Sequence, residues 1–390
     1  MTASIPARTP SLAVPAGAVA FATAVVVATE FIVVGLLPAM ARDLKISLPE
    51  VGGFVSAFAF SSAVFGPLLM IPAGRWQPRR VMAVALIPFV LGNLAAAAMP
   101  SYTMLLLVRI LQGATLPVLV SVGSAAVASL AGPGREGWAV SLIYIGVVAG
   151  IVVAMPAGII LADAIDWRIS FVMLGGLAVV AAWGLFFGFP RMPMGRLPTM
   201  LDQLSILRQP ILQAQLLLSA VLFSAMFAPY TYLAALLEIT GGLGALSVAG
   251  VLAGFGLAGI PGNMIAGWLS DRGPTQATIG VALMLALAMA AVAFASDFLL
   301  LLLPLLAIWG AAHAAAFLLS QMRVMLSAPT APAFAAALNI SAANIGIAAG
   351  AAIGGAIVER AGIAATGLGG AALALLALMI AAALRGMGVR

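Results

Sequence analysis

The stretch TMLLLVRILQGATLPVLVSVGSAAVASL, residues 103–130, is long and apolar enough to cross the roughly 30 Å hydrocarbon core of a bilayer as one helix. It nevertheless carries Arg109 about a turn and a half from its start. A guanidinium at membrane depth costs at least about 2.5 kcal/mol, so it normally faces a protein interior and has a partner there. Glu30, in AVVVATEFIVVGLLP, is the one carboxylate elsewhere that lies well inside an apolar span. We therefore expect Glu30 and Arg109 to form a pair.

The composition indicates that the chain as a whole is a membrane protein. Of 390 residues, 64% are hydrophobic and only 7% are charged, whereas a soluble domain has about a quarter charged residues. The apolar runs reach 20 residues or more, and a membrane β-barrel would instead show segments of about ten residues that alternate in polarity. The sequence therefore predicts an all-α integral membrane protein.

Several function classes are excluded or disfavoured by the residues present. The basic residues that give a pI near 10.7 are scattered between apolar runs, so they form no nucleic-acid-binding face. The chain has no cysteine and one histidine, which leaves no metal cluster and no thiol nucleophile, and we expect no cofactor. An intramembrane enzyme is disfavoured because nucleophile and base are not clustered.

Twelve transmembrane spans are predicted, with ends uncertain by about four residues. They lie near residues 15–39, 51–73, 81–99, 103–130, 137–161, 169–189, 211–237, 246–269, 276–296, 298–326, 333–358 and 363–385. The longest polar interruption follows the sixth span. It divides the chain into an N-terminal six-helix half (1–189), a cytoplasmic linker (190–210) and a C-terminal six-helix half (211–390).

Orientation follows from the bias of lysine and arginine toward cytoplasmic segments. With the N-terminus inside, 12 of the 17 basic residues, Arg323 among them, fall in inside segments, and four fall in outside loops. Both termini are therefore expected in the cytoplasm, and the first apolar run is expected to be a retained span instead of a signal peptide.

Internal symmetry is visible in the loops that follow the second and eighth spans. Arg75 and Arg272 occupy corresponding places at an offset of 197 residues, and the same offset carries Gly158 onto Gly355. Together with the central linker, these matches indicate a duplicated six-span unit.

Three motifs add a family resemblance. GWLSDR at residues 267–272 fits a cytoplasmic loop motif G-x-L-x-D-R, LVRILQG at 107–113 fits a span-four arginine motif, and DWRISF at 166–171 fits a W-R-x-x-F turn before span six. TEFIVVGLLP at 29–38 and YTYL at 230–233 are similar to one branch of the family. On these motifs the chain resembles the major facilitator superfamily, within it the twelve-span drug:proton antiporters, and among those the bacterial AraJ-like sugar, drug and nucleoside efflux permeases.

The chain departs from the family pattern at two places. Gly74 stands where the first-half loop motif has an aspartate, which leaves Arg75 as the expected polar contact of that gate. The span-five antiporter motif keeps Gly150, Pro156 and Gly158, but Ala154 replaces a usual glycine. A proton-coupled importer or a facilitator of the same fold therefore stays open as the alternative.

The resemblance implies the major facilitator fold, with two pseudo-symmetric halves around a central cavity that opens alternately to each side. Spans one, four, seven and ten line this cavity. Arg75, Asp271 and Arg272 would act in gating, with Asp271 and Arg272 latching the cytoplasmic side.

Glu30 is the expected proton carrier. Burial favours its neutral form and a neighbouring Arg109 favours its ionised form, so a site balanced between them can load and release protons. The structural alternative is a permanent ion pair that ties spans one and four together. Arg109 also has a structural alternative, in which its guanidinium binds backbone carbonyls.

The predicted substrate site consists of polar and aromatic residues in the cavity-lining spans: Phe31, Gln112, Tyr230, Trp309, His313 and Phe317. The aromatic residues among them could instead serve packing, and His313 could be a neutral imidazole bonded between helices. Tyr230 and Tyr232 point about 200° apart on a helix, so we favour Tyr230, beside the kink expected at Pro229.

The function predicted from these features is proton-coupled export of small organic solutes by a secondary transporter of the bacterial inner membrane. Its partners are a small-molecule substrate, protons and the lipid bilayer, and a monomer is expected. The alternatives are the importer or facilitator named above and a non-transporting membrane sensor, which would bind a ligand without flux.

Overall fold

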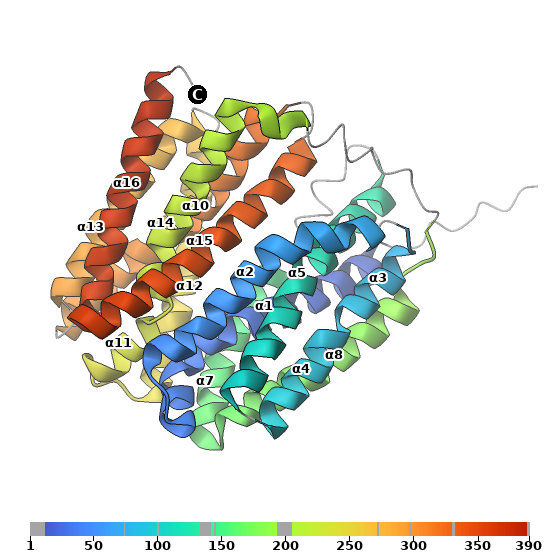
Figure 1. Ribbon diagram of the computed structural model, residues 1–390, viewed down its shortest axis with the longest axis horizontal. Helices are drawn as coiled ribbons and strands as arrows, with labels where there is room; N and C mark the ends of the chain where they lie inside the picture. The colour runs from blue at the N-terminus through green and yellow to red at the C-terminus, as the bar shows by residue number, and fades with distance from the viewer. Residues whose placement is uncertain are drawn as a thin grey trace, which may run out of the picture.

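The chain folds as a bundle of long helices (Figure 1). The computed structural model describes residues 12–73, 75–99, 101–132, 142–143, 146–192, 205–270, 273–295, 298–329 and 332–387. All regular elements in these ranges are helical, and 12 helical segments are long and apolar enough to span a membrane. The prediction of an all-α protein with twelve spans is confirmed.

The first six spans consist of α1 (Ala13–Leu44), α2 (Leu48–Ala73), α3 (Pro78–Ala85) with α4 (Ile87–Ala98), α5 (Tyr102–Ala131), the π-helix η1 (Gly150–Ala154) with α7 (Met155–Ala164), and α8 (Trp167–Gly188). The last six follow the short helix η2 (Ser205–Arg208). They consist of α10 (Pro210–Tyr230) with α11 (Leu233–Ile239), α12 (Ala245–Ser270), α13 (Pro274–Ala295), α14 (Leu299–Ser327), α15 (Pro332–Ala361), and η3 (Ile363–Ala365) with α16 (Thr366–Gly386).

Proline accounts for one break within a span. The seventh span bends after Pro229, where α10 ends at Tyr230 and α11 begins at Leu233. Between them, the Tyr232 N–H donates to the Pro229 carbonyl at 3.1 Å, three residues back, instead of continuing the α-helical ladder. This bend turns Tyr230 and Tyr232 toward different neighbours.

Helix α1 lies at the centre of the bundle because it is apolar around its whole circumference, as expected of a buried helix. It contacts α2, α5, α7 and α8 of the first six spans, and α11 of the last six. The two groups of helices also meet where α2 runs beside α15 and where α7 faces α12 (Figure 1). The division at residues 1–189, 190–210 and 211–390 stays a prediction, since residues 193–204 lie outside the described ranges.

Glycines bring pairs of spans close together, and they do so twice in the same way. A Cβ built on Gly146 would lie 2.1 Å from the Ala20 carbonyl oxygen, and one on Gly346 would lie 2.4 Å from that of Ala220. Both residues of the second pair are numbered 200 higher than those of the first. Span five therefore packs on span one as span eleven packs on span seven, which is the packing expected of a duplicated unit.

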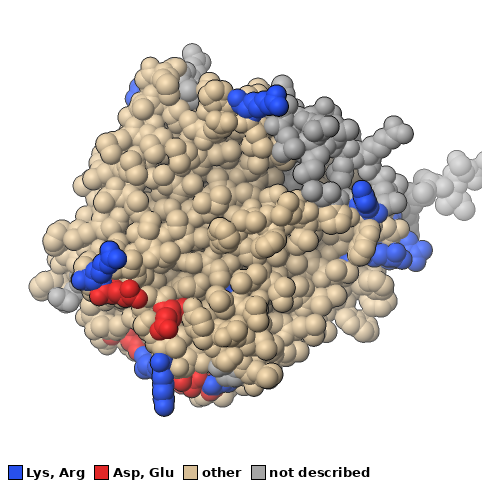
Figure 2. Space-filling model, in the orientation of Figure 1, with Lys and Arg blue, Asp and Glu red and all other residues tan. Residues whose placement is uncertain are grey.

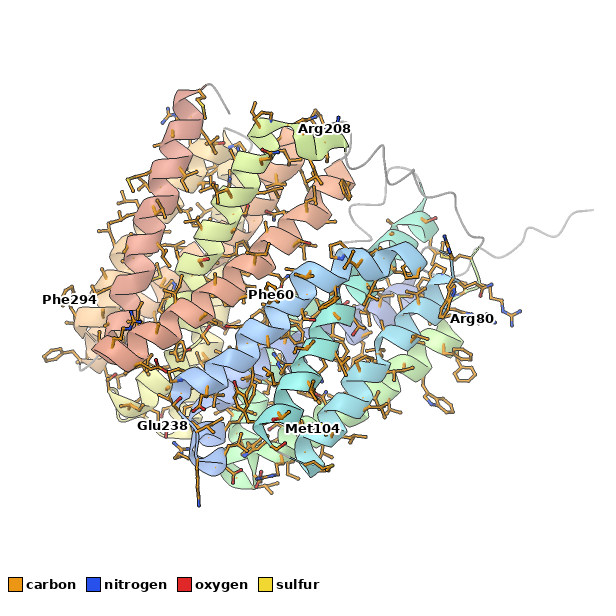
Figure 3. All side chains as sticks on the ribbon, in the orientation of Figure 1. Phe60, Arg80, Met104, Arg208, Glu238 and Phe294 are labelled. Atoms are coloured by element: carbon orange, nitrogen blue, oxygen red, sulfur yellow. The ribbon has the colours of Figure 1, made fainter. Side chains whose placement is uncertain are left out.

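Charged side chains are confined almost entirely to the two ends of the bundle (Figure 2). One end carries Arg80 and Arg208 and is called here the linker end (Figure 3). The other, the Glu238 end, carries every described aspartate and glutamate except Glu30. The wide apolar surface between the ends is the surface that a lipid bilayer would cover.

Candidate functional site

Arg109 is held by the backbone of two neighbouring helices. Its side chain is 2% exposed, and its two terminal nitrogens donate to the carbonyl oxygens of Thr29 and Glu30, each at 2.7 Å. Its Nε donates to the Phe54 carbonyl at 3.4 Å, and the guanidinium carbon lies 4.3 Å from the ring centroid of Phe58. The buried cation thus joins α5 to α1 and α2 by hydrogen bonds and a cation–π contact.

Glu30 meets Arg109 through its main chain. The carboxylate of Glu30 is partly buried, and it forms neither a hydrogen bond nor an ion pair with any described residue. The two residues are therefore in contact, as expected, but the contact joins the guanidinium to a carbonyl. The carboxylate therefore has no hydrogen bond or ion pair within the described part of the chain, although it still attracts the Arg109 guanidinium electrostatically.

Gln112 belongs to a buried polar network that begins at the same turn of α1. Its amide nitrogen donates to the Asn93 side-chain oxygen at 2.9 Å, and the Asn93 amide donates to the Thr29 hydroxyl at 3.3 Å. The Gln112 side-chain oxygen is buried and accepts no hydrogen bond from a described residue. Thr29 therefore connects this network to Arg109, and Gln112 lies apart from the aromatic residues predicted for the substrate site.

The other predicted substrate residues come together around His313. The His313 ring centroid lies 5.1 Å from that of Tyr230 and 5.6 Å from that of Phe317. We call the whole group the aromatic cluster; it consists of Phe31, Phe223, Phe227, Tyr230, Phe255, Trp309, His313 and Phe317. It draws its rings from α1, α10, α12 and α14, so it joins the first group of helices to the second.

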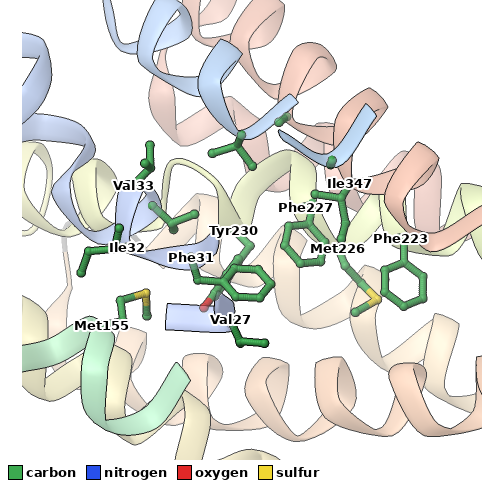
Figure 4. Packing of buried hydrophobic residues seen from close by; sticks show 14 of the residues in the cluster. Val27, Phe31, Ile32, Val33, Met155, Phe223, Met226, Phe227, Tyr230 and Ile347 are labelled. Carbon is green, nitrogen blue, oxygen red and sulfur yellow. The ribbon is translucent and has the colours of Figure 1, made fainter. Parts of the chain in front are cut away.

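Phe31 supplies the link from the cluster to Glu30. Its ring stacks on Phe227 with centroids 6.0 Å apart, and the Phe227 ring in turn contacts that of Tyr230, with centroids 5.5 Å apart (Figure 4). Phe31 follows Glu30 directly in α1. The Glu30 carboxylate and one ring of the aromatic cluster therefore come from the same turn of this helix.

Two nitrogens in the cluster lack hydrogen-bond partners. Trp309 Nε1 and His313 Nδ1 are buried and have no hydrogen-bond partner within the described ranges, and Trp309 as a whole is 0% exposed. An unpaired buried N–H costs free energy, and it is commonly kept where a ligand supplies the acceptor. A cavity of about 370 Å³ between α12 and α14 adjoins the cluster at Phe255, but it includes neither Glu30 nor His313.

Sequence reasoning missed Phe223, Phe227 and Phe255. Phe223 and Phe227 lie four residues apart on α10, and Phe227 lies three before Tyr230, so their helical spacing to Tyr230 was a usable signal. Phe255 had no such signal, because a phenylalanine in an apolar span looks like any other packing residue.

The span-five residues of the predicted motif lie against α1. A Cβ built on Gly150 would lie 2.7 Å from the Ala24 carbonyl oxygen, and one on Gly158 would lie 2.1 Å from the Ile32 side chain. The π-helix that begins at Gly150 precedes Pro156. These residues set how closely span five approaches the helix that carries Glu30.

Of the predicted gating residues, Arg75 is exposed in the turn after α2 and forms no ion pair with a described residue. Asp271 and Arg272 lie outside the described residues. Their gating roles stay predictions.

Polar contacts between the two groups of helices occur on the side of the Glu238 end. Arg42, at the end of α1, pairs with Glu238, and the Ser56 hydroxyl of α2 donates to the Ala348 carbonyl of α15 at 3.0 Å. Within the second group, the Tyr232 hydroxyl donates to the Ala351 carbonyl at 3.0 Å. This hydroxyl also lies against the first group at Gly52, where a Cβ would lie 2.1 Å from its oxygen. Among described residues, no side-chain hydrogen bond or ion pair joins the two groups at the linker end.

Twelve spans in two groups, with an arginine buried among α1, α2 and α5, form a multi-pass membrane protein of the transporter class. The chain belongs to the major facilitator superfamily, whose sequence model matches residues 19–333. It is 32% identical to the inner membrane transport protein YdhP of Escherichia coli strain K12, over 95% of this chain and 94% of that protein.

Other relatives carry more specific names. The chain is 29% identical to a chloramphenicol resistance protein of Streptomyces lividans, over 83% of each chain. It is 26% identical to a probable sugar efflux transporter of Mannheimia succiniciproducens, over 92% of this chain and 91% of that protein. The crystal structure of the nucleoside transporter NupG has the same fold, with a TM-score of 0.78 at 15% identity, over 96% of this chain and 100% of that chain. The predicted superfamily resemblance is confirmed.

Proposed function

We propose that this transporter exports small organic solutes in exchange for protons. The observation that carries the proposal is the carboxylate of Glu30, which lies in mid-span without a hydrogen-bond or ion-pair partner among described residues. The names of relatives that are called efflux or resistance proteins support the export direction.

Glu30 serves as the proton carrier in this proposal, and Arg109 serves as its positioning partner. A charge in the membrane interior is costly, so the carboxylate is easiest to ionise where water or a cation can reach it. Arg109 fixes the turn of α1 that carries Glu30 by binding the carbonyls of Thr29 and Glu30. The proton is then taken up on one side and released on the other, as the site changes the side to which it is open.

The substrate is held by the aromatic cluster. Its rings suit the apolar or aromatic part of a solute, while Trp309 Nε1 and His313 Nδ1 offer hydrogen bonds to one polar group. With one carboxylate nearby, a neutral or weakly charged amphipathic solute fits better than a multiply charged one. Gln112 contributes indirectly, through Asn93 and Thr29.

Alternating access follows from the same arrangement. We assign the linker end and both termini to the cytoplasm, because among described residues this end carries basic residues and no acidic ones. The contacts of Arg42 with Glu238 and of Ser56 with Ala348 then close the outer side. Opening outward breaks these contacts, and Arg75, Asp271 and Arg272 would close the cytoplasmic side.

Transport in everted membrane vesicles tests the direction. With the vesicle interior made acidic, wild type should accumulate a solute such as chloramphenicol, and Glu30→Gln should reduce the rate at least tenfold. Glu359→Gln, which changes an exposed carboxylate at the Glu238 end, serves as the matched control and should transport normally. Accumulation that depends on the opposite gradient would replace export by import.

A further inference from the structure

A second arginine is buried in the last six spans. Arg323 is 1% exposed and lies about one turn before the end of α14 at Ser327. The sequence placed Arg323 among the inside segments by the bias of basic residues, and it gave no sign that the side chain is buried. Its Nη1 donates a hydrogen bond to the side-chain oxygen of Gln215 on α10. It forms no ion pair with a described residue.

The free donors of Arg323 form one edge of the guanidinium. Nε and Nη2 are both buried, and neither has a hydrogen-bond partner among the described residues. In the planar guanidinium these two N–H groups point in nearly parallel directions, on the side away from Nη1. This edge is the fork that binds two oxygens of a carboxylate or phosphate at once.

The surrounding polar side chains already have partners of their own. The hydroxyls of Ser219 and Ser320 lie 2.6 Å apart, and Ser320 also donates to the Asn339 side-chain oxygen at 3.3 Å. The Asn339 amide donates to the Gln321 side-chain oxygen at 2.7 Å. These bonds join α10, α14 and α15, and none of them uses or neutralises the fork of Arg323.

Arg109 provides a comparison within the same chain. Both arginines are buried to about the same extent, but Arg109 uses Nε, Nη1 and Nη2 on three backbone carbonyls. Arg323 uses Nη1 alone. A cation that only tied helices together would be expected to be saturated as Arg109 is, because an uncompensated buried charge is unfavourable.

We propose that Arg323 and Gln215 form a binding site for an oxyanionic group, a carboxylate or a phosphate, whose oxygens accept from Nε and Nη2. Gln215 holds Nη1 and so orients the fork. The site is separate from Glu30 and the aromatic cluster, and it does not depend on the direction or coupling of transport. It lies beside the linker, since Ile206 of η2 packs in one apolar cluster with Val324. An anion bound here would therefore stabilise the linker end.

Thermal unfolding of the purified protein in nanodiscs tests the proposal. Inorganic phosphate is titrated against chloride at constant ionic strength, in nanodiscs of phosphatidylcholine alone. A second arm uses nanodiscs that contain phosphatidylglycerol and no added phosphate. We expect a saturable rise in melting temperature in at least one arm. A rise with phosphate identifies a free anion, and a rise with phosphatidylglycerol alone identifies a lipid headgroup.

The variants separate the site from a general salt effect. Arg323→Gln should lose the rise, and Arg323→Lys, which keeps the charge but not the fork, should need at least ten times more ligand. Arg208→Gln changes an exposed cation at the same end and should respond as wild type does. Equal responses in Arg323→Gln and Arg208→Gln, or no response of wild type in either arm, would overturn the proposal.

Gln215→Glu gives an independent test, because this variant leaves Arg323 and its positive charge in place. The new carboxylate would lie beside the guanidinium and supply its counter-ion. We expect this variant to melt at a higher temperature than wild type without ligand and to respond much less to phosphate or phosphatidylglycerol. A variant that melts lower than wild type and keeps the full ligand response would contradict the site.

Discussion

Arg109 binds Glu30 at its backbone carbonyl, 2.7 Å from Nη2, and the carboxylate of Glu30 forms no hydrogen bond or ion pair with a described residue. In the proposed mechanism the two residues have separate roles. The hydrogen bonds of Arg109 fix the helix, and the Glu30 carboxylate changes its charge. A permanent salt bridge would have made both residues structural, because protonation would then have to break the pair.

The anchoring of Arg109 predicts that lysine cannot replace it. Lysine lacks the planar guanidinium whose separate nitrogens bind the carbonyls of Thr29, Glu30 and Phe54 and whose face contacts Phe58. Arg109→Lys should therefore lose about 1–3 kcal/mol of stability and most of the transport activity. Thermal unfolding measures the first effect, with Arg208→Lys as the control at an exposed site. A melting temperature equal to that of wild type would show that the carbonyl contacts are dispensable.

The unpaired indole of Trp309 predicts opposite effects on stability and transport. Trp309→Phe removes a buried N–H that has no hydrogen-bond partner among the described residues, so stability should hold or rise by up to about 1 kcal/mol. The Michaelis constant for a solute with a hydrogen-bond acceptor should rise several-fold. Trp183→Phe, at a side chain 66% exposed on the bundle surface, is the control. An unchanged Michaelis constant would mean that Trp309 only packs.

Gly150 packs closely on α1 and Gly350 packs closely on α10, which predicts similar losses of stability when either glycine is replaced. A Cβ at Gly150 or Gly350 would lie 2.7 or 2.6 Å from a backbone oxygen of the neighbouring helix. Each alanine variant should lose about 1–3 kcal/mol, because backbone atoms cannot yield as a side chain does. Gly176→Ala has open space around its Cβ and should be neutral or slightly stabilising. The melting temperatures of the three alanine variants test this prediction. Equal values for all three would contradict the close approach of the neighbouring helices at Gly150 and Gly350.

In the proposed orientation the contact between Ser56 and Ala348 lies on the outer side, and it predicts that a cross-link there locks the transporter reversibly. The chain contains no cysteine, so Ser56→Cys with Ala348→Cys gives a single thiol pair across α2 and α15. Oxidation should cross-link the pair and stop transport, and reduction should restore it, because opening outward separates these helices. Each single variant should transport with or without oxidant. Full transport by the cross-linked protein would exclude this contact from the moving outer side.

The sequence predicted most of the fold because apolar runs of membrane length, together with basic loops, leave few alternatives. It also predicted that Arg109 and Glu30 meet, since intramembrane charges are rare. It could not predict which atoms meet, because that depends on the rotation of α1 and α5 about their axes. Arg323 was missed because a cation near the end of a span already has an explanation in the positive-inside rule. Phe255 was missed because an apolar ring in an apolar span carries no distinguishing signal.

The most direct test of the central claim is proton release from purified, detergent-solubilised protein in weak buffer. Drugs, nucleosides, sugars and organic acids are added in turn to wild type, Glu30→Gln and the control Glu359→Gln. We predict that one class of compound releases protons from wild type and from the control, and that Glu30→Gln binds the same compound without release. Binding to wild type without proton release, or equal release from Glu30→Gln, would contradict proton exchange at Glu30.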